Sequence, residues 1–337
     1  MGKRSSLEPA ARAIRDRRGN ETHVKRIRAV VQRGYGGPAV LELRSIDLGE
    51  PGEGEVRVRQ SAIGVNFHDI YVRTGQYKTL TVPGVPGIEA VGVITAVGPN
   101  VEGWPVGRRV AYVDRGYGAY CEERLVSQDL LLAPPEELPD ELIASSLVRG
   151  LTATMLMEQV FTVRASDLCL IHAVGGTTGR LLATWARHIG AQVVGTLGDP
   201  SKSPGVAALC DHVYSYSQED WAEQIEAAYG ASMTYVCDSV GAPTFRGSVA
   251  LADRCGHIAL FGQSGGAVQS VSVSDLAAKS LTLTRPILFD YLKSAARRAA
   301  MMRSFYSLVG EGVLQLQSPI SLPLGDAGVA QAMLEQR

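Results

Sequence analysis

The stretch LCLIHAVGGTTG, residues 168–179, decides the fold. It opens with an apolar run, residues 168–172, which predicts a buried strand. A turn of small residues follows, and the amphipathic pattern of residues 180–188, closed by Gly190, predicts a helix with a glycine just past its end. A strand, a glycine-rich turn and a helix in this order are typical of the first unit of a parallel α/β sheet.

Further apolar runs lie downstream of this unit, at 192–197, 214–216, 234–237, 257–261 and 281–284. Helical stretches separate them, so this part of the chain is predicted to form a doubly wound, mostly parallel sheet. Such a sheet binds its ligand in a crevice at the carboxyl ends of the strands.

Upstream, short β-branched runs are separated by Gly and Pro, at 28–32, 54–61, 90–97, 109–113 and 119–126. Valine and charged residues alternate over residues 55–59, which is typical of a half-buried strand. This part is therefore predicted to be an all-β, barrel-like domain, and the boundary between the two parts is expected near Gly150.

The composition excludes several classes of protein. The 337 residues carry 33 Lys and Arg against 34 Asp and Glu, so no global attraction to nucleic acid or to a membrane surface is expected. The 5 cysteines form no CxxC pair, which argues against a zinc ribbon and a disulfide framework and favours the cytoplasm. No apolar run approaches the roughly 20 residues of a membrane span.

The first 26 residues are rich in Lys and Arg and lack an apolar segment. They are interpreted as a flexible, solvated tail. An arm that binds nucleic acid or a protein partner, and a weak organelle presequence, are the alternatives.

The glycine-rich turn has the residue types that a dinucleotide needs. Small residues let the backbone turn sharply, approach a pyrophosphate and bring helix and strand close together, and the helix N-terminus faces the anion. The spacing of Gly176 and Gly179 suits this geometry. A purely structural turn is the alternative.

The next strand indicates which dinucleotide. NAD needs a carboxylate at the end of this strand, but the chain has Thr196 and Leu197 there, and Asp199 before Pro200 is more simply a helix N-cap. Lys202 offers a positive charge for a 2′-phosphate. The sequence therefore favours NADPH over NADH.

Several motifs together carry a family resemblance. They are Gly64-Val65-Asn66-Phe67, Pro86-Gly87-Ile88-Glu89, Gly150-Leu151-Thr152, Asp238-Ser239-Val240-Gly241 and Leu283-Thr284-Arg285-Pro286. From about residue 27 onward the chain resembles the zinc-free quinone oxidoreductases, of ζ-crystallin type, in the medium-chain dehydrogenase/reductase superfamily.

The resemblance implies an α/β protein with a GroES-like β-barrel catalytic domain and a Rossmann domain. The implied segments are a tail at 1–26, the catalytic domain at 27–149, the NADPH-binding domain at 150–288 and a return to the catalytic domain at 289–337. It also implies a homodimer, with NADPH as cofactor and neither zinc nor flavin. Where the zinc-binding branch has metal ligands, this chain has Asn66 and Ile88-Glu89, a poor set for zinc.

The resemblance also assigns site residues. Tyr77, with Tyr71 second, is the expected hydrogen-bond donor to the acceptor oxygen, although both rings could simply wall the pocket and a quinone could take its proton from solvent. The cofactor-binding residues it implies are Asn66, Thr152, Gly176, Thr177, Thr178, Gly179, Gly198, Lys202, Tyr216, Phe261, Gly262 and Ser264.

The expected function is an NADPH-dependent, zinc-independent reductase that transfers hydride to a quinone or another activated α,β-unsaturated carbonyl. One alternative is an enoyl-thioester reductase, for which Arg73 or Lys78 would supply a basic entrance. Another is a non-catalytic NADPH-binding or RNA-binding protein. The chain departs from the family pattern at Thr177-Thr178 and at Ser203-Pro204-Gly205, and the second departure weakens the placement of Lys202.

Overall fold

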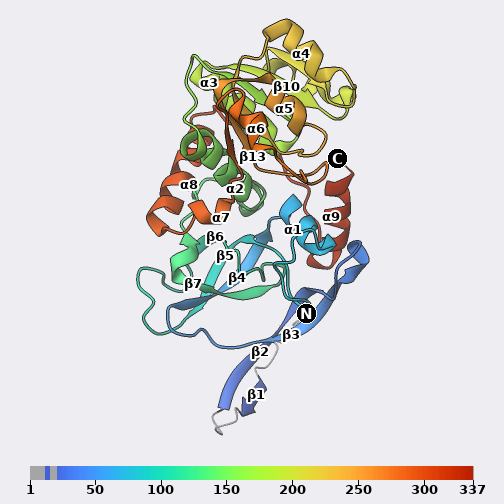
Figure 1. Cartoon of the computed structure of the whole chain (residues 1–337). Helices are drawn as coiled ribbons and strands as arrows, with labels where there is room; N and C mark the ends of the chain where they lie inside the picture. The colour runs from blue at the N-terminus through green and yellow to red at the C-terminus, as the bar shows by residue number, and fades with distance from the viewer. Residues whose placement is uncertain (1–11, 16–20, 337) are drawn as a thin grey trace, which may run out of the picture. The chain divides into compact units, whose positions relative to one another are not determined.

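The computed structural model describes residues 12–15 and 21–336, in two compact units. Unit 1 runs to Leu147 and resumes at Gln317, and unit 2 is Val148–Leu316. Figure 1 shows the elements of both. The return to unit 1 was expected at 289 but lies at 317. The reason is that helix α8, Ala295–Gly310, packs inside unit 2, where Phe305 covers Gly150.

Unit 1 is built from strands that form two antiparallel sheets. One has three strands in the order β1-β2-β3, and the other has five in the order β7-β4-β5-β6-β8. A bridge between Ala29 and Cys121 and another between Gln32 and Gly84 connect them into a curled, GroES-like barrel. The strands are β1 (Arg12–Arg15), β2 (Glu21–Gln32), β3 (Leu41–Leu48), β4 (Glu55–Ile63), β5 (Glu89–Val97), β6 (Arg109–Val113), β7 (Glu123–Ser127) and β8 (Leu131–Leu132).

The alternation in β4 has the predicted consequence. Val56 and Val58 are fully buried in the barrel core, while Arg59 on the opposite face is exposed. The helices of unit 1 are α1 (Phe67–Thr74) and α9 (Ala327–Glu335), which lie side by side in Figure 1, together with the start of α2 (Asp140–Thr154).

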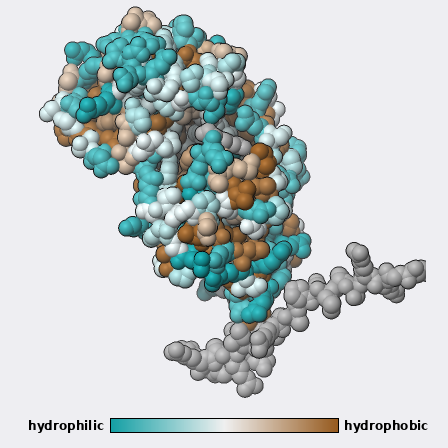
Figure 2. Space-filling view, turned by 90° about the vertical axis from the view of Figure 1, so that its right-hand side faces the viewer, coloured by the Kyte–Doolittle hydropathy of each residue, from teal (hydrophilic) through white to brown (hydrophobic). Residues whose placement is uncertain are grey.

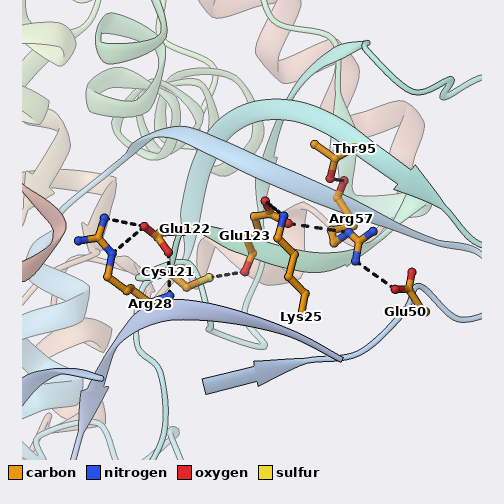
Figure 3. Close-up of polar contacts among 8 residues, drawn as sticks. All are labelled: Lys25, Arg28, Glu50, Arg57, Thr95, Cys121, Glu122 and Glu123. Carbon is orange, nitrogen blue, oxygen red and sulfur yellow. Dashed lines mark hydrogen bonds and ion pairs between the residues drawn. The ribbon is translucent and has the colours of Figure 1, made fainter. Parts of the chain in front are cut away.

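Part of the expected tail is strand. Residues 21–26 belong to β2, where Lys25 pairs with Leu48 of β3 in the ladder. The amino group of Lys25 lies 2.6 Å from a carboxylate oxygen of Glu123, a side chain that also approaches Arg57 (Figure 3). The hydrogen-bonded ladder with β3 and the ion pair with the largely buried Glu123 explain why the chain forms a strand at Lys25. Residues 1–11 and 16–20 of the expected tail lie outside the described residues.

Unit 2 contains a six-stranded sheet that is parallel throughout, in the order β11-β10-β9-β12-β13-β14. This is the strand order 3-2-1-4-5-6 of a Rossmann fold. The strands are β9 (Leu168–Ile171), β10 (Gln192–Leu197), β11 (His212–Ser215), β12 (Met233–Asp238), β13 (Ala252–Leu260) and β14 (Thr282–Thr284).

The helices of unit 2 between and after the strands are α3 (Thr177–Ile189), α4 (Trp221–Tyr229), α5 (Phe245–Leu251), α6 (Val273–Ala277), α7 (Leu288–Tyr291) and α8. The central strands supply the core, with Leu170, Val194, Val236 and Ile258 fully buried. Over the described residues, no helix is long and apolar enough to cross a membrane. On the face shown in Figure 2, hydrophobic residues are interspersed with hydrophilic ones.

Candidate functional site

The glycine-rich turn connects β9 to α3 in unit 2, as the sequence predicted. Ala173 adopts a left-handed backbone with φ of 52°, and its carbonyl accepts a hydrogen bond from the N–H of Gly176 at 2.9 Å. The N–H of Val174 donates to the carbonyl of Thr196 in β10 at 3.0 Å. The turn is therefore attached to both strands, and Gly176 is the N-cap of α3.

The two spaced glycines have different surroundings. A methyl group at Gly179 would lie 2.5 Å from the carbonyl oxygen of Ala173 and 2.8 Å from Cα of Val174, so Gly179 allows the helix to approach the strand. A methyl group at Gly176 would meet only the Ala173 oxygen, at 3.3 Å. The backbone at Gly176 is exposed, so a pyrophosphate can approach the N-terminus of α3 at this point. The loop fits a dinucleotide.

The residues expected at the adenosine end lie on the same edge of the sheet. The ring of Tyr216 covers Gly198, where a methyl group would lie 2.9 Å from the phenol oxygen, and burial raises the pKa of Tyr216. The alkyl chain of Lys202 passes Gly175, with Cδ 3.7 Å from the position of a methyl group there. The structure therefore brings Gly198, Lys202 and Tyr216 next to the turn.

Asp199 has the N-capping role predicted for it. Its Oδ1 accepts a hydrogen bond from the N–H of Ser201 at 3.0 Å, at the start of the 3₁₀ helix Pro200–Gly205. Hydrogen bonding from the side chain and then from the backbone of Ser201 lowers the pKa of Asp199, and Oδ2 lies 3.8 Å from the amino group of Lys202. Asp199 therefore caps this 3₁₀ helix as predicted, and Lys202 is a cation beside the glycine-rich turn.

The residues expected near the nicotinamide within unit 2 follow β13. The N–H groups of Phe261 and Gly262 donate to the carbonyl of Asp238, at 2.8 and 3.3 Å, and Gly262 packs against Ser239 so closely that no side chain fits. Phe261 is partly buried and Ser264 is exposed. Thr152 lies in α2, where its hydroxyl donates to the carbonyl of Val148 at 2.7 Å.

A buried polar network lies behind these loops. The carboxylate of Asp238 accepts hydrogen bonds from the hydroxyls of Thr244 and Ser248, all at 2.9 Å, and Ser248 is 3.0 Å from Nε2 of His172. Nδ1 of His172 lies 2.7 Å from the hydroxyl of Thr196. Burial lowers the pKa of His172, so the ring is neutral at pH 7. The network connects the ends of β9, β10 and β12.

In unit 1, Asn66 caps helix α1 and is held by a buried carboxylate. The backbone N–H of Asn66 donates to Oδ2 of Asp69 at 2.8 Å, and its side-chain amide donates to Oε1 of Glu89 at 2.6 Å. All three side chains are buried. Gly64 is required here, because any Cβ at that position would collide with the Glu89 carboxylate and with the carbonyl oxygen of Ala144.

The same residues show that a zinc ion fits poorly. The Asn66 amide is a hydrogen-bond donor to Glu89, and the neighbouring Ile88 is an apolar side chain that is 1% exposed. An apolar side chain provides no ligand, and an amide nitrogen is not a zinc donor. In the part of the chain that the structure describes, no group of three His, Cys, Asp or Glu side chains could hold a metal ion.

The two candidate tyrosines belong to an aromatic group in unit 1. The rings of Tyr71 and Tyr77 meet edge to face, with centroids 5.1 Å apart, and His68 packs on Tyr77 at 5.6 Å. Nε2 of His68 lies 3.1 Å from the hydroxyl of Tyr117, which also contacts the hydroxyl of Thr79. Burial, and next Arg115, lower the pKa of His68 to about 4, while burial raises that of Tyr117.

Helix α9 is held against α1 by a buried arginine. Arg73 is 1% exposed, and its guanidinium donates to the carbonyl of Gly36 and to the side chains of Gln331 and Glu335, at 3.1, 3.1 and 2.5 Å. The interactions of Arg73 are with unit 1 itself. A basic entrance for a thioester carrier, the role considered for it above, is not available to a cation buried in this way.

The structure brings the predicted residues together in two groups. Unit 2 holds the glycine-rich turn with Gly198, Lys202 and Tyr216. Unit 1 holds Asn66 at the start of α1, the helix that also carries Tyr71, whose ring meets Tyr77. The sequence did not predict that Glu89 holds Asn66 or that His68 meets Tyr117. Gly64 was the available signal for the first, since a glycine before a cap suggests a close approach. Nothing local pointed to the second.

Comparison with known proteins agrees with this arrangement. Residues 52–167 match the family model "Alcohol dehydrogenase GroES-like domain", and residues 177–303 match "Zinc-binding dehydrogenase". The chain is 35% identical to a 2-haloacrylate reductase from Burkholderia sp, over 92% of this chain and 96% of that protein. It is 34% identical to a quinone oxidoreductase from Pseudomonas aeruginosa, over 90% and 94%.

Among solved structures, a quinone oxidoreductase from Escherichia coli complexed with NADPH superposes with a TM-score of 0.86 at 31% identity, covering 92% of this chain and 96% of that one. The chain therefore belongs to the quinone oxidoreductases of the medium-chain dehydrogenase/reductase superfamily. The expected family and the expected two-part α/β fold are both confirmed.

Proposed function

We propose that the protein is an NADPH-dependent reductase of quinones or other activated α,β-unsaturated carbonyl compounds. The observation that carries this proposal is the cluster at one edge of the unit 2 sheet. There the side chain of Lys202 passes Gly175, next to the exposed backbone of Gly176, and the ring of Tyr216 lies over Gly198. The relatives named as quinone oxidoreductase and 2-haloacrylate reductase support the acceptor class.

When bound, NADPH supplies the hydride. The chain's own part begins with binding, in which the N–H groups at the start of α3 face the pyrophosphate and the hydroxyls of Thr177 and Thr178, on the first turn, provide additional donors. Lys202 and Tyr216 bind the adenosine phosphate. In unit 2, Phe261, Gly262, Ser264 and Thr152 would hold the nicotinamide end, and Asn66 is the residue of unit 1 to which the same role is assigned. Tight loop packing around Asp238 keeps the first three in place.

Tyr77 donates a hydrogen bond to the oxygen on which negative charge develops. Its ring is held between Tyr71 and His68, which restricts its rotation. Tyr71 is the second donor. A phenol suits this task because it is protonated at neutral pH and donates a single directed hydrogen bond. The reaction proceeds without zinc, because the Asn66–Glu89 pair occupies the positions where metal ligands would be needed.

The active protein is a homodimer located in the cytoplasm, without flavin and without a nucleic-acid partner. The terminal strand of the parallel sheet, β14, supports the dimer, because a strand at a sheet edge can pair with the same strand of a second copy. The domains are the barrel unit, which binds the acceptor, and the Rossmann unit, which binds NADPH.

The enoyl-thioester alternative loses one support, because Arg73 is buried in unit 1. Lys78 remains on the surface. The test is a comparison of acceptors with purified protein and NADPH: 1,4-benzoquinone, 9,10-phenanthrenequinone, 2-chloroacrylate and crotonyl-CoA. We expect turnover with a quinone or with 2-chloroacrylate. Saturable turnover with crotonyl-CoA alone would favour the thioester reductase, and tight NADPH binding without any turnover would favour a non-catalytic role.

A further inference from the structure

Arg180 connects the glycine-rich turn to the segment that carries Lys202. It lies on the first turns of α3, directly after Gly179. Its Nε donates to the carbonyl oxygen of Gly175 at 3.2 Å, and its Nη1 donates to the carbonyl oxygen of Gly205 at 2.7 Å. One planar guanidinium therefore joins two backbone segments.

Besides the fully buried Val206 that follows it, the segment at the far end of this connection has few contacts that hold it. The 3₁₀ helix Pro200–Gly205 contains Pro204, buries none of its residues and ends at Val206 with a backbone that is not helical. Asp199 anchors its beginning through the N–H of Ser201, at 3.0 Å. Arg180 anchors its end. Lys202 lies between the two anchors, with its alkyl chain beside Gly175.

The two anchors explain how Lys202 is positioned although the sequence interrupts the helix after it. Pro204 and Gly205 disfavour a continuing helix, so the sequence alone leaves Lys202 without a defined position. In the structure, the carbonyl of Gly205 accepts the hydrogen bond from Arg180 instead of a helical one. Arg180 therefore contacts the chain directly at Gly205, where the helix is interrupted.

We propose that Arg180 is a positioning residue for recognition of the adenosine 2′-phosphate. It holds the Pro200–Gly205 segment against the glycine-rich turn, and so keeps the side chain of Lys202 in place beside Gly175. This inference rests on the proposed use of NADPH. The preference for the 2′-phosphate then depends on Arg180, which acts by positioning Lys202.

The geometry requires an arginine. A guanidinium has several donors in a rigid plane and can serve two carbonyls at once in fixed directions, whereas the single flexible ammonium of a lysine cannot span both in the same way. Charge alone is then insufficient, and Arg180→Lys should behave like Arg180→Met, which keeps the unbranched chain and removes the donors.

The test measures binding of 2′,5′-ADP and of 5′-AMP to the full-length protein by isothermal titration calorimetry, so that no turnover is needed. Their affinity ratio isolates the 2′-phosphate. We expect Arg180→Met and Arg180→Lys each to lower this ratio by about tenfold, the size expected for loss of a well-placed charge contact. The affinity for 5′-AMP should change much less. The double variant with Lys202→Met should lose little more than Lys202→Met alone, because both act on the same contact.

Arg187→Met is the matched control. Arg187 lies on the same helix and forms an ion pair with Asp211 at 2.9 Å, away from the turn, so its loss should leave the ratio unchanged. An unchanged ratio in Arg180→Met overturns the inference, and so does a wild-type ratio in Arg180→Lys, which would assign the effect to charge. Equal affinity of the wild-type protein for both nucleotides would instead refute the proposed use of NADPH, and with it the inference.

Discussion

Replacing Gly179 by alanine tests whether this glycine serves packing. The added methyl group would lie 2.5 Å from the Ala173 oxygen and 2.8 Å from Cα of Val174, roughly 1 Å short of an optimal contact. Both atoms are backbone and cannot rotate away. Overpacking of this kind costs about 1–3 kcal/mol, and alanine returns about 1 kcal/mol of helix propensity. We expect a net loss of up to about 2 kcal/mol in the free energy of unfolding, toward the upper end because neither backbone atom can move aside.

Gly176→Ala is the variant to compare with Gly179→Ala. Its methyl group meets only the Ala173 oxygen, at 3.3 Å, so its effect on stability should stay below about 0.5 kcal/mol, the scale for changes away from special features. The same methyl group stands where a pyrophosphate must approach, so NADPH binding should weaken by at least about tenfold. Gly310→Ala, at the end of α8 with no atom within 4 Å of the added group, is the control for alanine substitution itself.

The assay is urea-induced unfolding, in which the midpoints of the variants are compared at a common dependence of the free energy of unfolding on urea concentration. Calorimetric titration of NADPH measures binding to the same variants. In a domain of this size the expected loss for Gly179→Ala corresponds to a fall of up to about 8 °C in Tm. The packing argument is refuted if Gly179→Ala unfolds at the same urea concentration as the wild type. It is refuted equally if Gly176→Ala is the less stable of the two.

The remaining predictions concern unit 1. Tyr77→Phe should lower kcat with an enone acceptor by about 100-fold without changing the KM for NADPH, as steady-state kinetics would show, and an unchanged kcat would remove Tyr77 from its role. His68 is protonated below about pH 6.5 in the unfolded chain but only below about pH 4 in the folded protein. Its contribution to the free energy of unfolding is therefore complete above pH 6.5 and is lost as the pH falls toward 4. Urea titrations at several pH values should show a fall of roughly 2–3 kcal/mol from this group, absent in His68→Leu; equal slopes for both proteins would contradict the assignment. Arg73→Leu should lower the free energy of unfolding by about 3 kcal/mol, because Glu335 and its neighbours lose a buried partner. Arg44 is exposed, so Arg44→Leu should change the free energy of unfolding very little. Equal urea midpoints for the two variants would contradict the role of Arg73 in holding α9 against α1.

The fold was largely predictable because its signals are local. The apolar run at 168–172 and the alternation at 55–59 report burial residue by residue, and the structure has strands there. Where the chain bends, this signal fails. The strand expected at 119–126 begins only at Glu123, after the left-handed Tyr117. The strand expected at 257–261 begins already at Ala252 and passes through left-handed Cys255, so no alternation marks its beginning.

The candidate site was predictable where one segment contains the whole signal, as in the glycine spacing after β9. It was not predictable where the contact joins distant segments. Glu89 holds Asn66 across 23 residues, and Arg180 reaches Gly205 across 25. Neither partner carries a pattern of its own, since a single buried carboxylate or a single helical arginine has many ordinary roles. The strand at 21–26 was missed for the same reason, because the Glu123 that pairs with Lys25 lies far along the chain.

The proposed reductase uses NADPH through Lys202 and its neighbours and needs no metal. The most direct measurement is the ratio of kcat/KM for NADPH to that for NADH, with one quinone acceptor, before and after treatment of the protein with EDTA. We expect a clear preference for NADPH that EDTA leaves unchanged. Equal use of NADH, or activity that EDTA abolishes and zinc restores, would contradict it.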